Sequence, residues 1–263
     1  MRSFIRWAGS KCQLLPVLRQ YWTPAFRTYI EPFAGSATLF FDLMPGRAIL
    51  GDRNAELIEA IALVQTDVDR VLEAMRRLPR GRKPYYTLRR KDITTMAPVE
   101  RAARFLYLNR YCFNGLFRTN LRGEFNVPYG RQKNRVTIDE ALLISGAQQL
   151  RSAFVIQADF EDTIRYAGKN DFVYLDPPYV EDEGNGFTEY GPDSFGIKDL
   201  TRFSETLKRL NAIGAKFLVS YADTSSARKM LETWNVRRVW TRRNIAGFAQ
   251  KRRGVYELLA TNI

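Results

Sequence analysis

A motif of one acid, two prolines and an aromatic residue ends a strongly apolar stretch of the chain. Residues 172–175 read Phe-Val-Tyr-Leu, and Asp176, Pro177, Pro178 and Tyr179 follow them. β-Branched and aromatic residues between turn-formers predict a buried strand, which must end at the prolines because they cannot donate to a strand ladder. In an open parallel sheet, ligands bind beyond the carboxyl ends of the strands, where Asp176 and Tyr179 would project. An isolated motif of this kind is more commonly a plain proline turn.

The composition restricts the chemistry that such a site could perform. The 263 residues include no histidine and two cysteines, Cys12 and Cys112. A Ser-His-Asp triad, a histidine base and a histidine-ligated zinc ion are excluded, and two cysteines form neither a disulfide framework nor a cysteine metal site. Catalysis would therefore rely on carboxylates, backbone groups, lysine or a cofactor, and we expect no metal.

The charge of the chain points to a polyanionic partner. Lysine and arginine total 41 against 28 acidic residues, a formal net charge of +13. Basic residues gather at 76–91, 101–135 and 237–253, beside aromatic residues. A membrane surface is the competing partner, but no amphipathic helix with a clean apolar face carries these charges. No run approaches the ~18 apolar residues of a spanning helix, and the N-terminus lacks a signal-peptide core, so we expect a location inside the cell and no membrane.

The order of the predicted elements indicates an α/β fold interrupted by a long insert. With 45% apolar residues, the chain can bury a full core. The alternation of strands and helices stops near residue 66, gives way to a basic helical region, and returns near residue 153. The predicted strands are 28–30, 48–50, 153–157, 172–175, 216–221, 236–240 and 255–260, and the predicted late helices are 198–213 and 225–233.

The first predicted strand leads into a turn of small residues that suits a nucleotide-like ligand. The turn contains Phe33 and Gly35, and a glycine there permits close approach of a ligand to the backbone. The second strand ends at Asp52, about 20 residues on, the spacing at which an acid holds ribose hydroxyls. The alternative is a helix cap, since Asn54 precedes an amphipathic helix, and neighbouring residues can fill both roles. One glycine without a GxGxxG pattern is a weak signal by itself.

Residues 109–131 form a strip of arginine, asparagine and aromatic side chains. Gly115, Gly123 and Gly130 punctuate the strip, as in a β-hairpin with no buried side. Arginine can read guanine, asparagine suits adenine, small apolar groups meet the thymine methyl, and an aromatic ring can fill a gap in the base stack. A solvated hairpin is the alternative, which the density of asparagine and arginine disfavours.

Together these motifs resemble those of Dam-type (GATC) DNA adenine-N6 methyltransferases. The resemblance covers nearly the whole chain and rests on residues 6–11, 31–35, 51–52, 109–131, 176–179, 242–253 and 257–259. It implies a Rossmann-like, S-adenosylmethionine-dependent methyltransferase sheet, mostly parallel with an antiparallel last strand, and a helical target recognition insert bearing a β-hairpin. Residues 1–55 and 153–263 would form the catalytic and cofactor-binding domain, and residues 56–152 the DNA-binding domain.

The resemblance also implies a role for each matching residue. S-adenosylmethionine would contact Trp7, Lys11, Phe33, Gly35, Asp52 at the ribose, Asp159 and Phe160 near the adenine, and Asp176 between cofactor and substrate. Double-stranded DNA would contact Arg6 and Arg118 at guanines, Leu116 and Pro128 at a thymine methyl, Phe113 and Asn114 beside the extruded adenine, and Arg110, Asn120 and Arg122 as supports of the backbone and the hairpin. The enzyme would act as a monomer in the cytoplasm, at the bacterial nucleoid or in a host cell if phage-encoded.

Three residues depart from the family pattern. Ala37 stands near the usual second glycine of the cofactor turn, which would change cofactor affinity. Phe113 stands where tyrosine is common, so stacking is kept while the interactions of a hydroxyl are missing. Arg6 stands where the best-known relative has lysine.

The chemistry of adenine explains why a family would use these groups. The exocyclic amine is a poor nucleophile because its lone pair is delocalised into the ring. Acceptors on Asp176 and the Pro177 carbonyl would favour sp³ geometry at the nitrogen and stabilise its developing positive charge, while Tyr179 stacks on the base. The base would first have to leave the duplex. The same logic serves cytosine N4 or an RNA amine, and a DNA-binding module without catalytic activity is the alternative outside enzymes.

Overall fold

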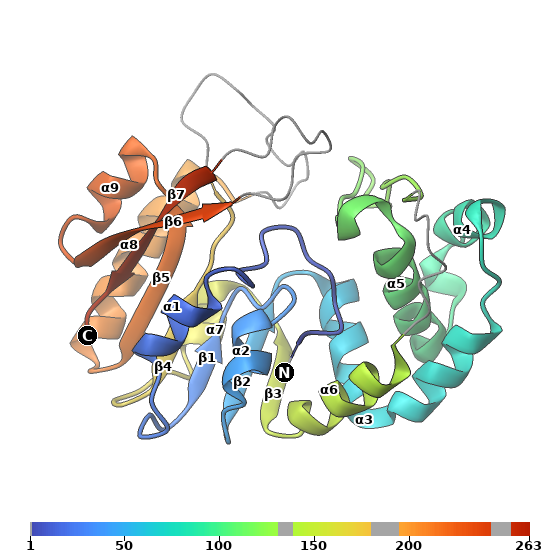
Figure 1. Cartoon of the computed structure of the whole chain (residues 1–263), viewed down its shortest axis with the longest axis horizontal. Helices are drawn as coiled ribbons and strands as arrows, with labels where there is room; N and C mark the ends of the chain where they lie inside the picture. Colours follow the sequence, from blue (N-terminus) through green and yellow to red (C-terminus); the bar gives the residue numbers. More distant parts are fainter. Residues whose placement is uncertain (1, 131–138, 180–194, 243–253) are drawn as a thin grey trace.

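A seven-stranded sheet with helices on both faces organises the molecule (Figure 1). The computed structural model describes residues 2–130, 139–179, 195–242 and 254–263. Along the chain the strands are β1 (Tyr29–Glu31), β2 (Ala48–Asp52), β3 (Ala153–Gln157), β4 (Phe172–Leu175), β5 (Lys216–Ala222), β6 (Asn235–Arg242) and β7 (Gly254–Thr261). Their order across the sheet is β3-β2-β1-β4-β5-β7-β6; β7 pairs antiparallel with both β5 and β6, and all other pairs are parallel. The predicted α/β sheet, mostly parallel with an antiparallel last strand, is confirmed.

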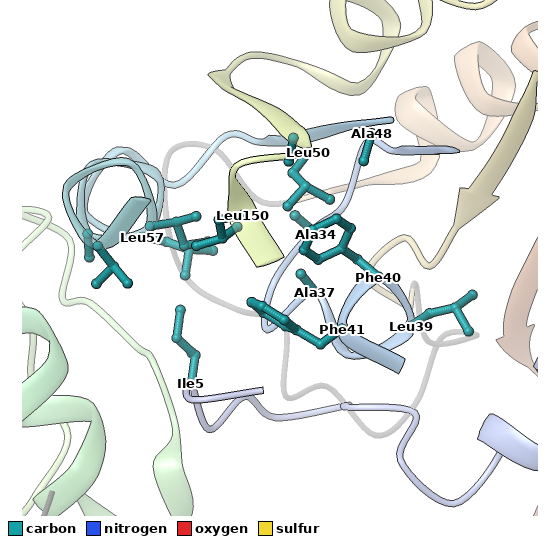
Figure 2. Packing of buried hydrophobic residues seen from close by; sticks show 14 of the residues in the cluster. Ile5, Ala34, Ala37, Leu39, Phe40, Phe41, Ala48, Leu50, Leu57 and Leu150 are labelled. Carbon is teal, nitrogen blue, oxygen red and sulfur yellow. The ribbon is translucent and has the colours of Figure 1, made fainter. Parts of the chain in front are cut away.

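Alternating side chains of the strands fill one core on each face of the sheet. Tyr29 and Phe172 belong to the first core, whereas Ile30 and Val173 belong to the second. Figure 2 shows the first core around Phe40. Helices of the first core are α1 (Leu15–Leu18), α2 (Thr38–Leu43), α3 (Ala55–Arg77), α5 (Pro98–Tyr111) and α6 (Glu140–Leu150), and those of the second are α7 (Phe160–Ile164), α8 (Ile197–Ala212) and α9 (Ser225–Leu231).

The predicted insert extends the first core away from the sheet. Val71 of α3 and Phe105 of α5 share that core with sheet residues such as Leu50. A smaller third core lies further out, where Tyr85 of α4 (Arg82–Arg89) meets Tyr107 of α5. The first core therefore runs through the predicted boundary at residues 55–56, and the division into two domains stays a prediction.

The predicted β-hairpin over residues 109–131 needs correction. Residues 109–111 are the last turn of α5, and residues 112–130, called the two-armed loop below, are joined by isolated antiparallel bridges in place of regular strands. The loop also has a buried side, because Phe125 and Val127 pack into the third core. Helices α4 and α5 provide an apolar surface for these side chains, which the local sequence does not reveal.

Neither a membrane span nor a metal cluster occurs within the described residues. None of the helices in these ranges is long and apolar enough to cross a membrane. The same ranges contain no group of three or more cysteine, aspartate or glutamate side chains placed to hold a metal ion.

Candidate active site

Asp176 lies at the carboxyl edge of the sheet, directly after β4, and two side chains hold its carboxylate. Lys11 Nζ donates to it at 2.8 Å, and Ser220 Oγ donates to it at 2.9 Å. Ser220 lies on β5, the parallel neighbour of β4, whereas Lys11 comes from the N-terminal segment. Because the Asp176 side chain is still 20% exposed, its carboxylate is fixed in place but accessible to a substrate.

Lys11 is a buried cation whose side chain is only 7% exposed. Its ammonium also donates to the Gly9 carbonyl at 2.9 Å and lies 5.2 Å from the centre of the Tyr179 ring. Burial alone would lower the pKa of Lys11, but the neighbouring Asp176 carboxylate more than offsets this effect, and the pKa is raised. Lys11 therefore stays charged at neutral pH and balances the charge of Asp176.

Ser220 and Tyr174 support Asp176 from inside the sheet. Ser220 is fully buried, and its hydroxyl lies 2.8 Å from the hydroxyl of Tyr174 on β4. Since the single proton of Ser220 goes to Asp176, Tyr174 donates to Ser220. The sequence analysis did not select either residue. A serine inside the otherwise apolar strand β5 was the available signal, because buried polar groups need a partner.

Tyr179 packs beside Asp176 and is mostly covered by its neighbours. Its ring centre lies 5.1 Å from that of Tyr221, whose hydroxyl donates to the Pro178 carbonyl at 3.5 Å. Burial raises the pKa of Tyr179, so its hydroxyl stays neutral. Pro177 is buried directly after Asp176. The motif thus brings a carboxylate, a proline backbone and an aromatic ring to one edge of the sheet.

The turn after β1 is tied to the end of β2 through Asp52. One carboxylate oxygen of Asp52 accepts from the Gly35 N–H at 2.9 Å, and the other accepts from the Asn54 N–H at 2.9 Å. Asn54 in turn caps α3, accepting from Leu57 N–H at 3.0 Å. Burial raises the pKa of Asp52. The cap belongs to Asn54, and Asp52 ties the turn after β1 to the start of α3, while its contact with a ribose stays a prediction.

Trp7 joins this turn to the two-armed loop. Gly35 has φ +47°, and a Cβ added there would lie 2.8 Å from Trp7 Cδ1, so only glycine fits beneath the indole. The indole also stacks on Phe117 with ring centres 5.6 Å apart and planes at 19°. Ala37, the departure from the family glycine, also has a left-handed φ of 48°. Packing is therefore part of the role of Trp7, and its ring borders the turn.

Phe33, Asp159 and Phe160 meet at the same edge of the sheet. The rings of Phe33 and Phe160 stack with centres 5.3 Å apart. Asp159 caps α7 by accepting from Glu161 N–H at 3.0 Å, and Arg202 of α8 donates to it at 2.7 Å. The Arg202 guanidinium also lies 4.8 Å from the centre of the Phe160 ring. Arg202 escaped the sequence analysis because its contact spans 43 residues and carries no local signal.

A buried acid, Glu31, stands behind the site. It is 3% exposed at the end of β1 and accepts from the hydroxyl of Tyr29 at 2.8 Å. Burial raises the pKa of Glu31 well above its usual range, and the charge of Asp176 adds to the rise although the Tyr29 hydrogen bond opposes it. The charged form of Glu31 is thus the disfavoured one.

Comparison with known proteins decides which enzyme this arrangement belongs to. A sequence model described as D12 class N6 adenine-specific DNA methyltransferase matches residues 7–245, most of the chain. The chain belongs to this methyltransferase class. It is therefore an enzyme that methylates adenine N6 in DNA, and S-adenosylmethionine is its methyl donor.

Curated relatives span the full length of this methyltransferase. The "DNA adenine methylase" of Salmonella typhi is 36% identical over 98% of this chain and 94% of its own length. The "DNA adenine methylase" of Escherichia coli K12 is 34% identical with the same coverage. The "Type II methyltransferase M1.LlaDCHI" of Lactococcus lactis subsp. cremoris is 34% identical over 100% of this chain and 95% of its own.

Arg6 of the methyltransferase is tied to α5 and to the start of the two-armed loop. Its N–H donates to Asn109 Oδ1 at 3.0 Å, and Asn109 Nδ2 donates back to the Arg6 carbonyl at 2.6 Å. Its guanidinium donates to the Arg110 carbonyl at 3.2 Å. A Cβ on Gly115, which has φ +66°, would lie 2.6 Å from Arg6 Cβ. Residues more than 100 positions apart thus form one corner of the molecule.

The predicted DNA-binding side chains of the loop have different surroundings. Phe113, Asn114, Arg118, Arg122 and Pro128 are exposed, whereas Arg110, Leu116 and Asn120 are half-buried. Backbone pairing of Phe113 N–H with the Pro128 carbonyl at 2.9 Å places these two together. Arg118 Nε donates to Asn126 Oδ1 at 2.8 Å, while Asn120 accepts from the N–H groups of residues 122 and 124 at 3.0 Å each. These bonds fix Asn120 within the loop, and its role in DNA binding stays a prediction.

Proposed function

We propose that this methyltransferase modifies the adenine of GATC in duplex DNA after the base has rotated out of the helix. The observation that carries the proposal is the joining of Arg6 to the two-armed loop, which groups it with Phe113, Asn114 and Pro128 as exposed or accessible reading groups. Relatives named DNA adenine methylase support an adenine target. The names of the type II relatives state no target sequence, so the choice of GATC rests on the match of these residues to the Dam pattern.

Asp176 and the Pro177 carbonyl are the proposed acceptors for the two N–H groups of the adenine. A carboxylate already held by Ser220 and Lys11 needs little reorganisation when positive charge develops on the amine nitrogen. The exposed fraction of Asp176 leaves room for the amine. Tyr179, packed on Tyr221, would offer the base an aromatic surface that is already in place.

The cofactor residues proposed are Trp7, Lys11, Phe33, Gly35, Asp52, Asp159, Phe160 and Asp176. Their surroundings fit S-adenosylmethionine, because the Gly35 turn has no room for a side chain and Asp52 stands beside it at the end of β2. Bound there, S-adenosylmethionine supplies an electrophilic methyl group on a sulfonium. Within the protein, Asp52 would accept from ribose hydroxyls, and Phe33 and Phe160 would bound the adenine with their stacked rings.

Base flipping is proposed because the Asp176 side chain is only 20% exposed and the amine of a stacked, paired base would have to leave the duplex to reach it. Extrusion costs roughly a few kcal/mol in pairing and stacking energy. Phe113, 38% exposed on the loop, would offset part of this cost by filling the gap. In this proposal residues 1–55 and 153–263 bind the cofactor and catalyse methyl transfer, and residues 56–152 recognise the DNA. The enzyme acts as a monomer.

Tritiated methyl transfer into matched duplexes tests the target. We expect label in a duplex with GATC and background label when its central adenine is replaced to give GTTC. Asp176→Ala should abolish transfer while largely keeping DNA affinity. Equal labelling of both duplexes, or none in either, contradicts the proposed target. Light scattering at the assay concentration measures the molar mass and so tests whether the enzyme is a monomer.

A further inference from the structure

The outer edge of the sheet carries an exposed ladder of one arginine and two aromatic rings. Arg238 and Trp240 lie on β6, the edge strand, and Tyr256 lies opposite Trp240 on β7. Their exposed fractions are 52%, 57% and 41%. The Arg238 guanidinium lies 3.7 Å from the centre of the Tyr256 ring, and the rings of Tyr256 and Trp240 have centres 5.0 Å apart. We call these three residues the β6–β7 ladder.

Contacts on both sides hold the ladder in one conformation. Trp240 lies directly over Gly254, where an added Cβ would be 1.8 Å from the indole in its present position. Arg238 is bound through Nε to Asp223, an acid only 4% exposed that follows β5. The same carboxylate accepts from Arg228 Nε of α9 at 2.6 Å. Two guanidinium groups are thus fixed side by side, and both side chains remain more than half exposed.

Sheet stability alone does not account for this arrangement. A cross-strand aromatic pair contributes about 0.2–1 kcal/mol, and a tryptophan can shield a strand glycine. Neither effect requires two additional arginines anchored by a buried acid. Strand addition by another protein is also disfavoured, because charged side chains on an edge strand oppose it. From residue 225 to residue 242 the sequence has five basic residues, Arg228, Lys229, Arg237, Arg238 and Arg242, against one acid, Glu232.

The ladder lies where a long polyanion that crosses the site would contact it. Asp223 follows β5 at the carboxyl edge, the same edge at which Asp176 follows β4. In Figure 1, β6 and β7 rise at one side of this edge, and the end of α5 that leads into the two-armed loop rises at the other. A duplex lying over the edge would therefore meet both sides.

We propose that the β6–β7 ladder, together with Arg228, binds the sugar-phosphate backbone of duplex DNA that flanks the methylated site. Preset guanidinium groups suit phosphate oxygens, and their stacking on aromatic faces limits the conformational entropy cost of binding. Such a surface adds affinity without reading sequence. The proposal depends on the proposed function for the place of the target adenine, but not for its base sequence.

Binding to duplexes of two lengths tests this surface directly. The probes are a GATC duplex of about one helical turn and one of about three turns, at ~10 bp per turn. For the parent enzyme we expect tighter binding to the longer duplex. The double variant Arg228→Ala/Arg238→Ala should lose several-fold affinity for the longer duplex only. Its slope of log affinity against log salt should become shallower by about 0.9 for each phosphate that the variant no longer neutralises.

Controls separate this effect from misfolding and from a general reduction of charge. Arg165→Ala removes an arginine that is 75% exposed at the end of α7 and paired with Asp162, and it should leave both duplexes unaffected. If the double variant unfolds, Arg228→Ala alone, which leaves the bond between Arg238 and Asp223 in place, should still show a loss confined to the longer duplex. Equal losses on both duplexes, no loss on either, or the same loss in Arg165→Ala would overturn the proposal. If the parent enzyme does not methylate GATC, the proposed target is wrong. The length dependence of binding would still show whether the β6–β7 ladder binds flanking DNA.

Discussion

At the residue scale, the hydroxyl of Ser220 is an uncharged group that fixes the Asp176 carboxylate. Its proton is committed to Asp176, and the Tyr174 hydroxyl donates to its oxygen. Hydrogen bonds to charged groups contribute about 1.5–3 kcal/mol. Orientation of the carboxylate toward the amine matters most when charge develops on the nitrogen, so removal of this bond should lower kcat more than it changes KM for S-adenosylmethionine.

We therefore predict that Ser220→Ala lowers kcat by about 10- to 100-fold, the equivalent of 1.5–3 kcal/mol. Tyr174→Phe should have a smaller effect, because it keeps the bond between Ser220 and Asp176. Methylation rates over a range of S-adenosylmethionine concentrations give kcat and KM for both variants. Equal losses in the two variants, or a loss confined to KM, would show that Ser220 serves the packing of β5 and not the position of Asp176.

Arg118 carries a prediction about base discrimination. Its Nε is fixed by Asn126 while the side chain stays exposed, as expected of an arginine that reads a guanine. Arg118→Ala should cost about 1–3 kcal/mol of discrimination at one guanine position. Comparing kcat/KM on duplexes altered at each base pair measures this. The matched control is Arg122→Ala, also exposed on the loop, and a uniform loss across all duplexes for Arg118→Ala would show that it binds only backbone.

Glu31 links the stability of the free protein to pH. Its folded pKa is raised, mainly by burial, so its contribution to stability is fully present below the usual glutamate pKa of about 4.3 and is lost as pH rises through the folded pKa. Glu31→Gln removes this titration. Urea unfolding without cofactor is measured at pH values from 5 to 9, about one unit apart. As the pH rises, the unfolding free energy of the variant should increase relative to that of the parent. A stability difference that stays constant over this range would contradict the titration of Glu31.

At the element scale, the spacing of β2 and α7 depends on Gly51. A Cβ at Gly51 would lie 2.2 Å from Thr163 Oγ1, and Thr163 is fully buried on α7. Asp159 caps the same helix, so a shift of α7 would also move that carboxylate. The sequence motif containing residues 51 and 52 thus combines a packing requirement with a ligand position.

Gly51→Ala should destabilise the protein by about 1–3 kcal/mol, the usual cost of overpacking. Gly46→Ala is the matched control, because an added Cβ there meets nothing within 4 Å. Urea unfolding compares the two. Adding Thr163→Ala to Gly51→Ala should recover part of the loss, and strict additivity of the two substitutions would argue against a direct clash.

Elements of the sheet could be predicted within a few residues, because each strand is a short apolar run bounded by turn-formers. Strand 172–175 was predicted without error, whereas β6 extends past its apolar residues to Asn235 and Arg242, since pairing with β7 continues there. The buried side of the two-armed loop was missed. Phe125 and Val127 alternate as buried strand residues do, but the surface that covers them forms only when the loop folds back onto α5 and α4.

In the site, too, residues in contiguous motifs could be predicted, whereas contacts that depend on the tertiary fold could not. Asp176 could be selected because its motif is contiguous, and Lys11 because of the family match. The bond between Ser220 and Asp176 could not be predicted, since it requires the register that sets β4 beside β5. Arg202 and Arg6 likewise reach their partners only through the packing of helices α8 and α5.

At the scale of the whole molecule, a continuous first core joins the sheet to the helical insert. Leu57 and Val71 of α3, Phe105 of α5 and Leu50 of β2 belong to this one cluster. Removing the insert from the sheet would expose much of that apolar surface, at about 25 cal/mol per Å². The chain should therefore unfold as one unit, although residues 56–152 are proposed to carry a separate function.

We predict a single cooperative unfolding transition in urea with the same midpoint for two probes. Far-UV circular dichroism reports strongly on α3, α4 and α5, whereas tryptophan fluorescence reports on Trp7, Trp22, Trp234 and Trp240, all outside the insert. Coincident curves are the signature of a two-state transition. If the dichroism decreased at a lower urea concentration than the fluorescence, the insert would be an independent folding unit, and the shared core would contribute less than its burial indicates. Phe105→Ala should shift both curves together by about 3–5 kcal/mol of unfolding free energy, because truncating a buried phenylalanine weakens the core on both sides of the boundary.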